Sequence, residues 1–495
     1  MGMKNMANDD AFEDSCRTNG SFNPLNVYKD SSGQAVKSLD TAATRLHKDA
    51  QQRNTAGMAD ERSKVSKPLE SSIVREEWVI PDGGLKAWSI VVASFMILLS
   101  DGIRNSFGLL LPTIVLHFKS GRTEAALTNS LMNFLKLGFS PIVAELITRF
   151  GHRAISLVGI TTMIVGFVLA GVSVEAGYPI YVLHTTAGVM GGLGLALLYL
   201  PAVDIICKYF DRNLGLAVGI ATSGCAIGNV VMCPLVYQLN NKLGLGLTLV
   251  VLGGLFSPGV FFIALFDTPP SNLGGEETKK PGFKVYRGIL RDPKMLLLLL
   301  SHALVTMSSF TGFVFTADME HQLDIEVQFV TIIYFTMAVF SFLGRIIFGK
   351  ILDMFREKSF ILTTVMLVLL TGVLGASIYM PGLTGQLVFA GLFGFSFGSY
   401  ASSNIIILQI MCKDTVKESF GLCLAVFALS SIVTPGAIVG PMFDATGSYR
   451  LGSLVVTVLG LGGALVFALL AYLTTREQNQ ALAATCEQNY EQILD

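Results

Sequence analysis

The sequence is poor in charged residues. Only 14% of its 495 residues are Asp, Glu, Lys or Arg, whereas soluble globular chains carry about 25%. The 35 basic and 36 acidic side chains nearly cancel, so the composition gives no excess of positive charge of the kind that binds nucleic acid. This composition argues against an ordinary cytosolic enzyme and against a nucleic-acid partner.

Motifs for catalysis and metal binding are also scarce. The chain contains no HExxH motif and no complete P-loop, and its seven cysteines show neither a CxxC pair nor a metal-ligand spacing. We therefore expect no enzyme activity, no cofactor, no metal site and no disulfide framework. The first 80 residues lack an apolar segment, so we also expect no cleavable secretory signal.

Apolar residues and glycine are abundant. Hydrophobic types make up 52% of the chain, glycine occurs 50 times and phenylalanine 33 times. This mixture favours helices that pack closely in lipid. A spanning helix needs about 20 apolar residues. Twelve segments qualify: 88–116, 125–148, 154–174, 179–206, 213–238, 246–266, 294–317, 327–349, 359–380, 384–411, 419–442 and 451–474.

The charged residues divide the chain. They gather before the first apolar segment, between the sixth and seventh, and after the last. We predict an all-α membrane protein with twelve transmembrane helices in two six-helix halves, which is the major facilitator fold. The predicted parts are a disordered cytosolic tail (1–86), a first bundle (87–266), a cytosolic central loop (267–293), a second bundle (294–474) and a cytosolic C-terminal tail (475–495).

Lysine and arginine predict the orientation in the membrane. With the N-terminus in the cytosol, the loops on that side carry 15 of these residues and the opposite loops carry four. Basic loops stay on the cytosolic side, so we expect both termini there, in a multi-pass protein of the plasma membrane.

Two segments carry a family resemblance. Before the first span, the chain has a polar turn and a tryptophan: Asp82, Gly83, Gly84 and Trp88. After the fourth span, it has an aromatic pair, a basic residue and a glycine series: Tyr209, Phe210, Arg212, Gly219, Gly224 and Gly228. Both resemble the signatures of the monocarboxylate porter family (solute carrier family 16 and its fungal relatives) of the major facilitator superfamily.

We expect these signature residues to have mainly structural roles. Gly224 and Gly228 form a GxxxG pair that lets two helix backbones approach closely. Asp82 is expected to cap the N-terminus of the first helix rather than to bind substrate.

Ionisable residues inside spans are candidates for function, because their burial is costly unless they are paired or hydrated. Asp101 and Arg104 lie mid-span three residues apart, and therefore on one face. They form either a self-neutralising pair or part of a substrate or proton site. Lys136 lies mid-span in the second helix. Asp101 can balance only one of these two cations, and the excess charge suits an anionic substrate.

Arg345 in the eighth span is the preferred substrate ligand. A guanidinium matches a carboxylate with two parallel hydrogen bonds, and the resemblance implies that an arginine at this place holds the substrate carboxylate. The alternative is a tether between helices, to Asp353 or Asp318. Asp318, at the outer end of the seventh span, is also a candidate for proton coupling, as is Asp101.

Other ionisable residues have local explanations. Asp204 and Lys208 are four residues apart, as are Glu145 and Arg149, so each pair is expected to interact. Two histidines in spans, His184 and His302, either relay protons or pack as neutral side chains.

The sequence also departs from the proton-coupled members of the family it resembles. Their lysine in the first helix corresponds to a position near Leu109, and their aspartate before the helix-8 arginine corresponds to Ser341.

The resemblance implies alternating-access transport of a monocarboxylate or related small organic anion, with a proton as the candidate co-substrate. It also implies a single-span glycoprotein as a candidate partner for surface delivery. Two alternatives stay open: an uncoupled carrier of another organic solute, such as an aromatic amino acid, and a non-transporting metabolite receptor.

Overall fold

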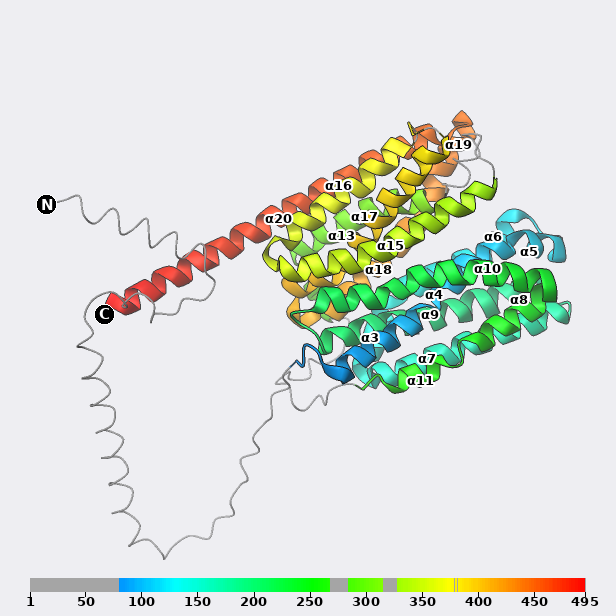
Figure 1. Cartoon of the computed structure of the whole chain (residues 1–495), viewed down its shortest axis with the longest axis horizontal. Helices are drawn as coiled ribbons and strands as arrows, with labels where there is room; N and C mark the ends of the chain where they lie inside the picture. Colours follow the sequence, from blue (N-terminus) through cyan, green and yellow to red (C-terminus); the bar gives the residue numbers. More distant parts are fainter. Residues whose placement is uncertain (1–79, 268–283, 315–326, 378, 381, 495) are drawn as a thin grey trace, which may run out of the picture. The chain divides into compact units, whose positions relative to one another are not determined.

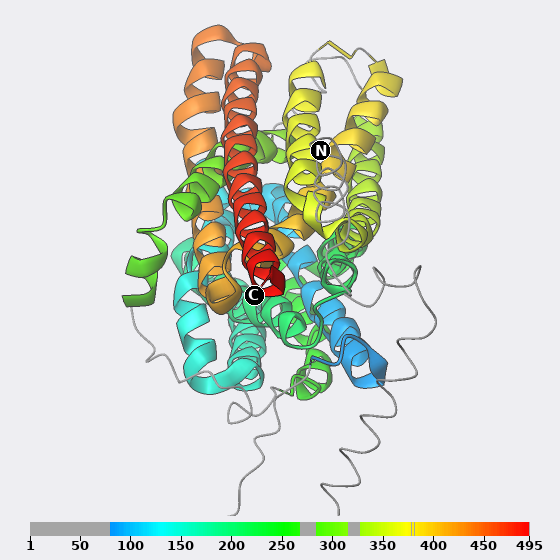
Figure 2. The same cartoon turned by 90° about the vertical axis from the view of Figure 1, so that its left-hand side faces the viewer.

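The computed structural model describes residues 80–267, 284–314, 327–377, 379–380 and 382–494. Contacts divide the chain into two units, and residues 76–476 form the one that contains the helical bundle. The bundle is built from two sets of helices, drawn blue to green and yellow-green to red, which lie in the lower and upper parts of Figure 1 and overlap in the middle of Figure 2. Most of the predicted tail 1–86, most of the predicted central loop and Asp318 lie outside the described residues.

The first half runs from residue 84 to residue 264. In chain order its elements are α3 (Gly84–Leu98), α4 (Asp101–Ser106), η2 (Phe107–Leu110), α5 (Leu111–Phe118), α6 (Arg122–Gly138), α7 (Ser140–Glu175), α8 (Ile180–Leu183), η3 (His184–Met190), α9 (Gly191–Asp204), η4 (Ile205–Lys208), α10 (Leu214–Leu255) and α11 (Gly259–Ala264).

The second half follows after a short helix, α12 (Lys284–Ile289). Its elements are α13 (Pro293–Val314), α15 (Val327–Met354), η5 (Arg356–Lys358), α16 (Ser359–Ser377), α17 (Gly382–Met411), η6 (Lys413–Thr415), α18 (Val416–Val433), η7 (Thr434–Val439), α19 (Gly440–Thr446) and α20 (Tyr449–Leu494).

The twelve predicted spans agree with this architecture. Within the described residues, ten helical stretches are long and apolar enough to cross a membrane. Two of them hold a glycine with a left-handed φ that ends one span and starts the next: Gly151 (φ 79°) in α7 and Gly244 (φ 77°) in α10. Glycine reaches this region without steric cost. Divided at these two glycines, and with α6 (Arg122–Gly138) completing the span that ends before Gly151, the ten stretches correspond to twelve spans.

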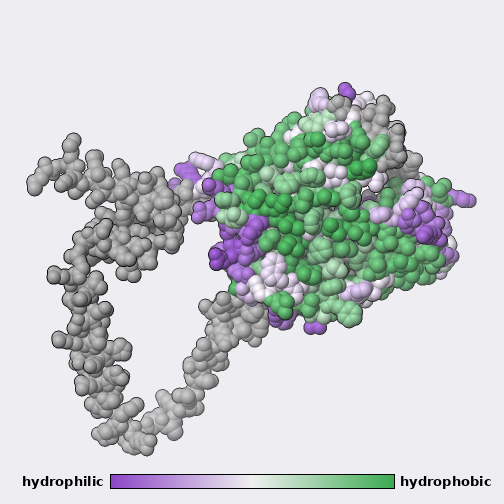
Figure 3. Space-filling model, in the orientation of Figure 1, coloured by the Kyte–Doolittle hydropathy of each residue, from purple (hydrophilic) through white to green (hydrophobic). Residues whose placement is uncertain are grey.

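The outside of the bundle is apolar. Large side chains such as Val458 and Leu465 are exposed, and hydrophobic residues cover most of the bundle surface in the space-filling view (Figure 3). In water such a surface would be strongly unfavourable, whereas in a bilayer it faces hydrocarbon chains.

Helix α10 joins the two halves through its glycines. A Cβ atom added to Gly219 would collide with the backbone carbonyl oxygen of Arg345 in α15, and one added to Gly228 would collide with that of Leu99. Gly224 lies in the same way against Phe95 in α3. The expectation that these glycines allow close helix packing is confirmed, and α10 thereby contacts the first half and the second half with one series of residues.

The two signature segments pack on each other. One carboxylate oxygen of Asp82 accepts hydrogen bonds from the backbone N–H groups of Asp211 (2.6 Å) and Arg212 (2.8 Å). The Trp88 ring meets the Phe210 ring edge to face, with centroids 5.2 Å apart.

The prediction that Asp82 caps the first helix is therefore wrong. Helix α3 begins at Gly84 without a side-chain cap. Positive φ angles at Asp82, Gly83 and Gly84 turn the chain before the helix, and this turn directs the carboxylate to the loop that precedes α10.

Candidate functional site

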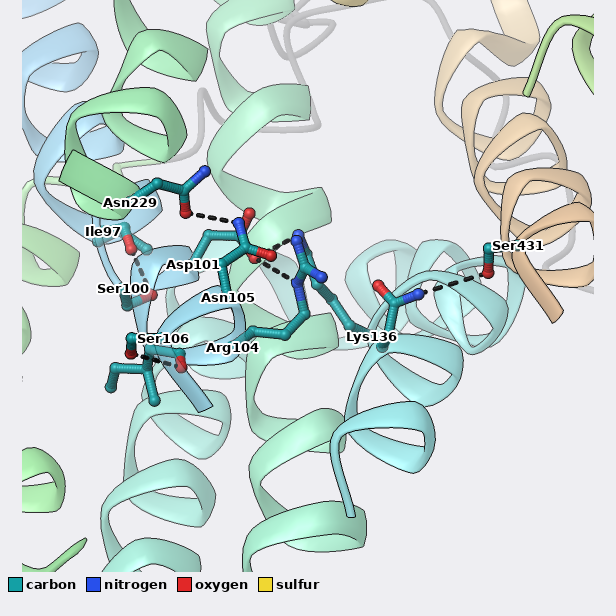
Figure 4. A network of polar contacts seen from close by, with 11 residues as sticks. Ile97, Ser100, Asp101, Arg104, Asn105, Ser106, Lys136, Asn229 and Ser431 are labelled. Atoms are coloured by element: carbon teal, nitrogen blue, oxygen red, sulfur yellow. Dashed lines mark hydrogen bonds and ion pairs between the residues drawn. The ribbon is translucent and has the colours of Figure 1, made fainter. Parts of the chain in front are cut away.

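Two cationic side chains of the first half, Arg104 and Lys136, contact the carboxylate of Asp101 (Figure 4). The Asp101 carboxylate accepts a hydrogen bond from Lys136 Nζ at 2.5 Å and one from Arg104 Nε at 3.3 Å. Asp101 is 6% exposed and Lys136 is 5% exposed. The predicted pairing of Asp101 with Arg104 is present, and the second predicted cation joins the same carboxylate.

The local structure explains how this cluster forms. Helix α3 ends at Leu98 and α4 begins at Asp101, so two residues separate them. Gly102 presses α4 against α10, because a Cβ on Gly102 would collide with the carbonyl oxygen of Gly228. Lys136 lies in the last turn of α6. Contact with α10 therefore fixes Asp101, and α6 brings the ammonium group to it.

An aromatic ring completes the surroundings of Lys136. Its Nζ atom lies 4.5 Å from the centroid of the Tyr199 ring, which belongs to α9. A cation over an aromatic face is attracted by the negative charge density of the ring. The sequence analysis missed Tyr199, because a tyrosine in the apolar run 194–203 gives no signal that separates it from a packing residue.

Arg345 of α15 has a different environment. It is 7% exposed, and its buried Nε atom has no hydrogen-bond partner. No ion pair involves Arg345 among the residues that the structure describes. A buried charge without a partner carries a desolvation cost of several kcal/mol, so the guanidinium is prepared for an anion that the described residues do not supply.

The proposed tether from Arg345 to Asp353 is wrong. The Asp353 carboxylate instead accepts hydrogen bonds from the backbone N–H groups of Gly215 (2.7 Å) and Leu216 (2.8 Å), at the start of α10. Free N–H groups at a helix start attract negative charge, and they compete successfully with the guanidinium two turns earlier in α15. The other proposed partner, Asp318, lies outside the described residues.

Arg345 and the Asp101 cluster share one electrostatic environment. The phenol of Tyr199 interacts with Arg345, Asp101 and Arg104. The thiol of Cys225 in α10 interacts with the same three residues and with Lys136. Arg345 of the second half and the Asp101 cluster of the first half thus act on the same two side chains, and together they form the candidate site.

Amide side chains extend this site. Asn105 Nδ2 donates to Asn229 Oδ1 at 2.6 Å (Figure 4). Asn133 Nδ2 donates to Ser431 Oγ at 3.4 Å. The second bond joins α6 of the first half to α18 of the second. Sequence reasoning missed these residues, although Asn133 lies three positions before Lys136 and therefore on the same helix face.

The remaining ionisable candidates have partners. Arg149 bonds Glu145 at 2.9 Å, as predicted. Asp204 lies 2.7 Å from the ring nitrogen of His152, a partner that its spacing to Lys208 did not suggest.

The two histidines predicted either to relay protons or to pack both have neighbours. His184 shares a hydrogen bond of 2.8 Å with Thr128, and the His302 ring lies 5.3 Å from the Tyr400 ring. These contacts agree with the packing alternative.

One segment of the sequence matches the GxSxG motif of hydrolases, but it lies inside a helix. The segment 394–398 reads Gly-Phe-Ser-Phe-Gly, which has the GxSxG spacing. In that motif the serine stands on a sharp turn between a strand and a helix. Here Ser396 lies inside α17 and its hydroxyl donates to the carbonyl oxygen of Leu392, so the segment lacks the geometry of a nucleophile.

Polar contacts close one end of the interface between the halves. We call this the basic end, and it comprises the loops that contain Gly151, Asp211, Arg356 and Lys413. In addition to the Asp353 bonds, Arg356 bonds the Asp211 carboxylate at 2.9 Å. Lys417 donates to Thr148 Oγ1 at 2.6 Å.

Tyr286 of α12 adds a further bond at the basic end. Its hydroxyl donates to the carbonyl oxygen of Pro141 at 2.5 Å. Burial, followed by the charges of Glu418 and Glu145, raises the pKa of Tyr286, so its hydroxyl stays a donor at neutral pH.

The comparisons with known proteins agree with this fold. The family model of the Major Facilitator Superfamily matches residues 91–435. The MFS transporter asaE of Aspergillus flavus is 26% identical over 392 residues, which cover 77% of this chain and 86% of that protein. Monocarboxylate transporter 4 of Gallus gallus is 23% identical over 401 residues, covering 79% of this chain and 83% of that protein.

A solved structure shows the same architecture. The fucose:proton symporter FucP of E. coli superposes with a TM-score of 0.56 over 78% of this chain and 97% of its own, at 14% sequence identity. At that identity the likeness concerns the fold alone. The match of the family model covers more than half of the sequence, and the chain therefore belongs to the major facilitator superfamily.

Proposed function

We propose that this chain is a secondary transporter that moves a small organic anion with a carboxylate group across a membrane by alternating access. The observation that carries the proposal is Arg345, a buried guanidinium with no ion pair among the described residues. It shares its surroundings with the Asp101 cluster of the other half. In major facilitators, substrate binds between the halves near the bilayer midplane.

The conformation fits one stage of such a cycle. The halves are joined at the basic end by Asp353, Arg356 and Lys417. Figure 1 shows the ribbons of α10 and α15 farther apart toward the opposite end. We propose that the basic end is cytosolic, because it carries most of the loop Lys and Arg residues. Because these contacts join the halves at the basic end, we propose that the site is reached from the outside in this conformation, in a protein of the plasma membrane.

The bonding of Asp101 supports a proposal of proton coupling. Two cations hold its carboxylate, and such neighbours favour the charged form. A substrate carboxylate that attracts Lys136 or Arg104 would weaken this hold and promote protonation of Asp101. We propose that substrate and proton bind together by this exchange. Asp318 remains a second candidate, and a single-span glycoprotein remains a candidate partner.

An uncoupled carrier is the second candidate function. The residues at the two positions that differ from the proton-coupled relatives carry no charge: Leu109 is 45% exposed, and Ser341 is buried in α15. This arrangement favours a carrier that does not require protons at those positions.

A competitive uptake screen in proteoliposomes tests the proposal. The purified chain is reconstituted, and uptake of short monocarboxylates, ketone bodies and aromatic amino acids is measured with and without an inward proton gradient. Saturable carboxylate uptake that rises with the gradient supports a proton symporter. Saturable uptake that ignores the gradient supports the uncoupled carrier. Specific binding without flux would contradict both and indicate a receptor.

A further inference from the structure

The charge of the candidate site does not balance. Three cations belong to it: Arg104, Lys136 and Arg345. Among the described residues, Asp101 is the one carboxylate that interacts with Tyr199 and Cys225. Among the residues that the structure describes, the site therefore carries an excess of two positive charges.

The count of charges takes each of the three cations in its charged form. Arginine stays protonated at any physiological pH. Lys136 Nζ has a carboxylate oxygen at 2.5 Å and an aromatic face at 4.5 Å, and both contacts attract an ammonium rather than an amine. With Lys136 counted as an ammonium on these two contacts, the excess of positive charge is two.

The two uncompensated charges lie at different places. Along α10, Gly219 contacts the backbone of Arg345, and Gly228 contacts the backbone of Leu99 and Gly102, which flank Asp101. These glycines are nine residues apart, which corresponds to about 13 Å along a helix. Long arginine and lysine side chains shorten this separation at their tips. One positive charge is therefore offered by Arg345, and the other by the cations around Asp101.

We propose that the preferred substrate is an organic dianion, such as a short dicarboxylate, with one anionic group on Arg345 and the other on the Arg104–Lys136 pair. This inference rests on the proposed transport function and specifies the class of its substrate. A monoanion would leave one buried positive charge without a partner, and burial of an unpaired charge is unfavourable. While Asp101 is ionised, a substrate with two anionic groups restores neutrality, and it contacts both halves at once.

Matched pairs of substrates test this proposal. Malonate, succinate and glutarate are each compared with their monoamides, which keep the carbon skeleton and lose one negative charge. Uptake and competition are measured at neutral pH in proteoliposomes that contain the full chain. For at least one pair we expect the diacid to be preferred about tenfold or more in kcat/KM, equivalent to about 1.4 kcal/mol.

Sulfate and pyruvate serve as further probes. Sulfate carries two charges on one centre and cannot contact both positions, so it should compete weakly. Pyruvate carries one charge and should be transported less efficiently than the best diacid. Equal competition by sulfate would overturn the proposal that two separate positions are occupied.

The variant Arg104→Gln provides an internal check. It removes one positive charge, while Asp101 keeps its bond to Lys136. The Arg104 side chain is 18% exposed and its bond to Asp101 is long, so folding should survive. We expect the preference for the diacid over its monoamide to disappear or to reverse. The same reversal is expected for Arg345→Gln if any transport remains.

The outcomes separate the inference from the function on which it rests. If monoamides and pyruvate are transported as well as the diacids, and Arg104→Gln leaves the ratio unchanged, the inference fails and the proposed function stands. If no carboxylate of either kind binds or moves, the proposed function itself fails.

Discussion

The two halves differ in how their buried charges are paired. In the first half, Asp101 holds Lys136 and Arg104 in one cluster, and each of the three has a partner within the same half. In the second half, Arg345 is buried without an ion pair among the described residues. The first arrangement compensates one of its two positive charges, whereas the second compensates none and depends on a ligand. The difference indicates that the buried ion pairs that stabilise the site lie in the first half, while both halves offer positive charge to a substrate.

The largest expected effect is on stability, for Asp101→Asn. This substitution leaves Lys136 and Arg104 buried without their carboxylate, and the loss of one partner of a buried pair costs about 3–5 kcal/mol. Thermal unfolding in detergent should show a clearly lower midpoint. The double variant with Lys136→Met should recover part of the loss. Strictly additive effects of the two substitutions would show that the cluster does not act as a unit.

For Arg345→Ala, stability and transport should respond in different directions. Removing an uncompensated buried charge relieves its desolvation cost, so the apo protein should unfold no earlier than the wild type. Carboxylate transport should fall by about 100-fold or more in kcat/KM, equivalent to about 2.7 kcal/mol.

Arg345→Lys is the matched control for this substitution, and it should retain part of the activity because it keeps the charge without the two-pronged geometry. Unchanged transport kinetics in Arg345→Ala would remove this residue from the substrate site.

The contacts at the basic end allow a third test. Asp353→Ala removes the acceptor for the Gly215 and Leu216 N–H groups, and loss of a helix cap costs about 0.5–2 kcal/mol. Amide hydrogen exchange of segment 211–220 should therefore accelerate by about tenfold. Glu357→Ala is the matched control, since it removes a nearby exposed carboxylate. Equal acceleration in both variants would contradict a specific role of Asp353.

The smallest expected effect concerns the ring beneath Lys136. Tyr199→Leu removes the aromatic face and should raise KM about three- to tenfold, within the range of a cation–π contact of about 0.5–2 kcal/mol. Tyr199→Phe keeps the face and should stay close to the wild type. If Phe and Leu were equally harmful, the hydroxyl rather than the ring would be the important group.

Much of the fold and part of the site could be predicted from the sequence. Runs of about 20 apolar residues are a direct consequence of bilayer thickness, so the spans follow from composition. The pairing of Asp101 with Arg104 follows from helix periodicity. Lys136 could be chosen as a candidate because a buried cation is rare in a span.

Other features depend on contacts that are distant in sequence. The Asp82 carboxylate bonds backbone groups 129 and 130 positions away, and Asp353 bonds a helix start 138 positions earlier. From the sequence alone, an aspartate near the start or end of one helix does not show that it binds the backbone of a different, distant helix or loop. Tyr199 and Cys225 lie in apolar segments, where burial is the ordinary outcome for their residue types. Only the packed bundle shows which buried groups surround the charges.

The glycines of α10 have a consequence for how this protein diverges from its relatives. At Gly219, Gly224 and Gly228 the helices meet backbone against backbone, with no side chains between them. A contact made of backbone atoms presents no side chain that could select a substrate. Residues that line the path can change with each new solute, while these backbone contacts stay, within the first half at Gly224 and Gly228 and between the halves at Gly219. The same helix contacts of α10 can therefore be combined with binding sites for many different substrates.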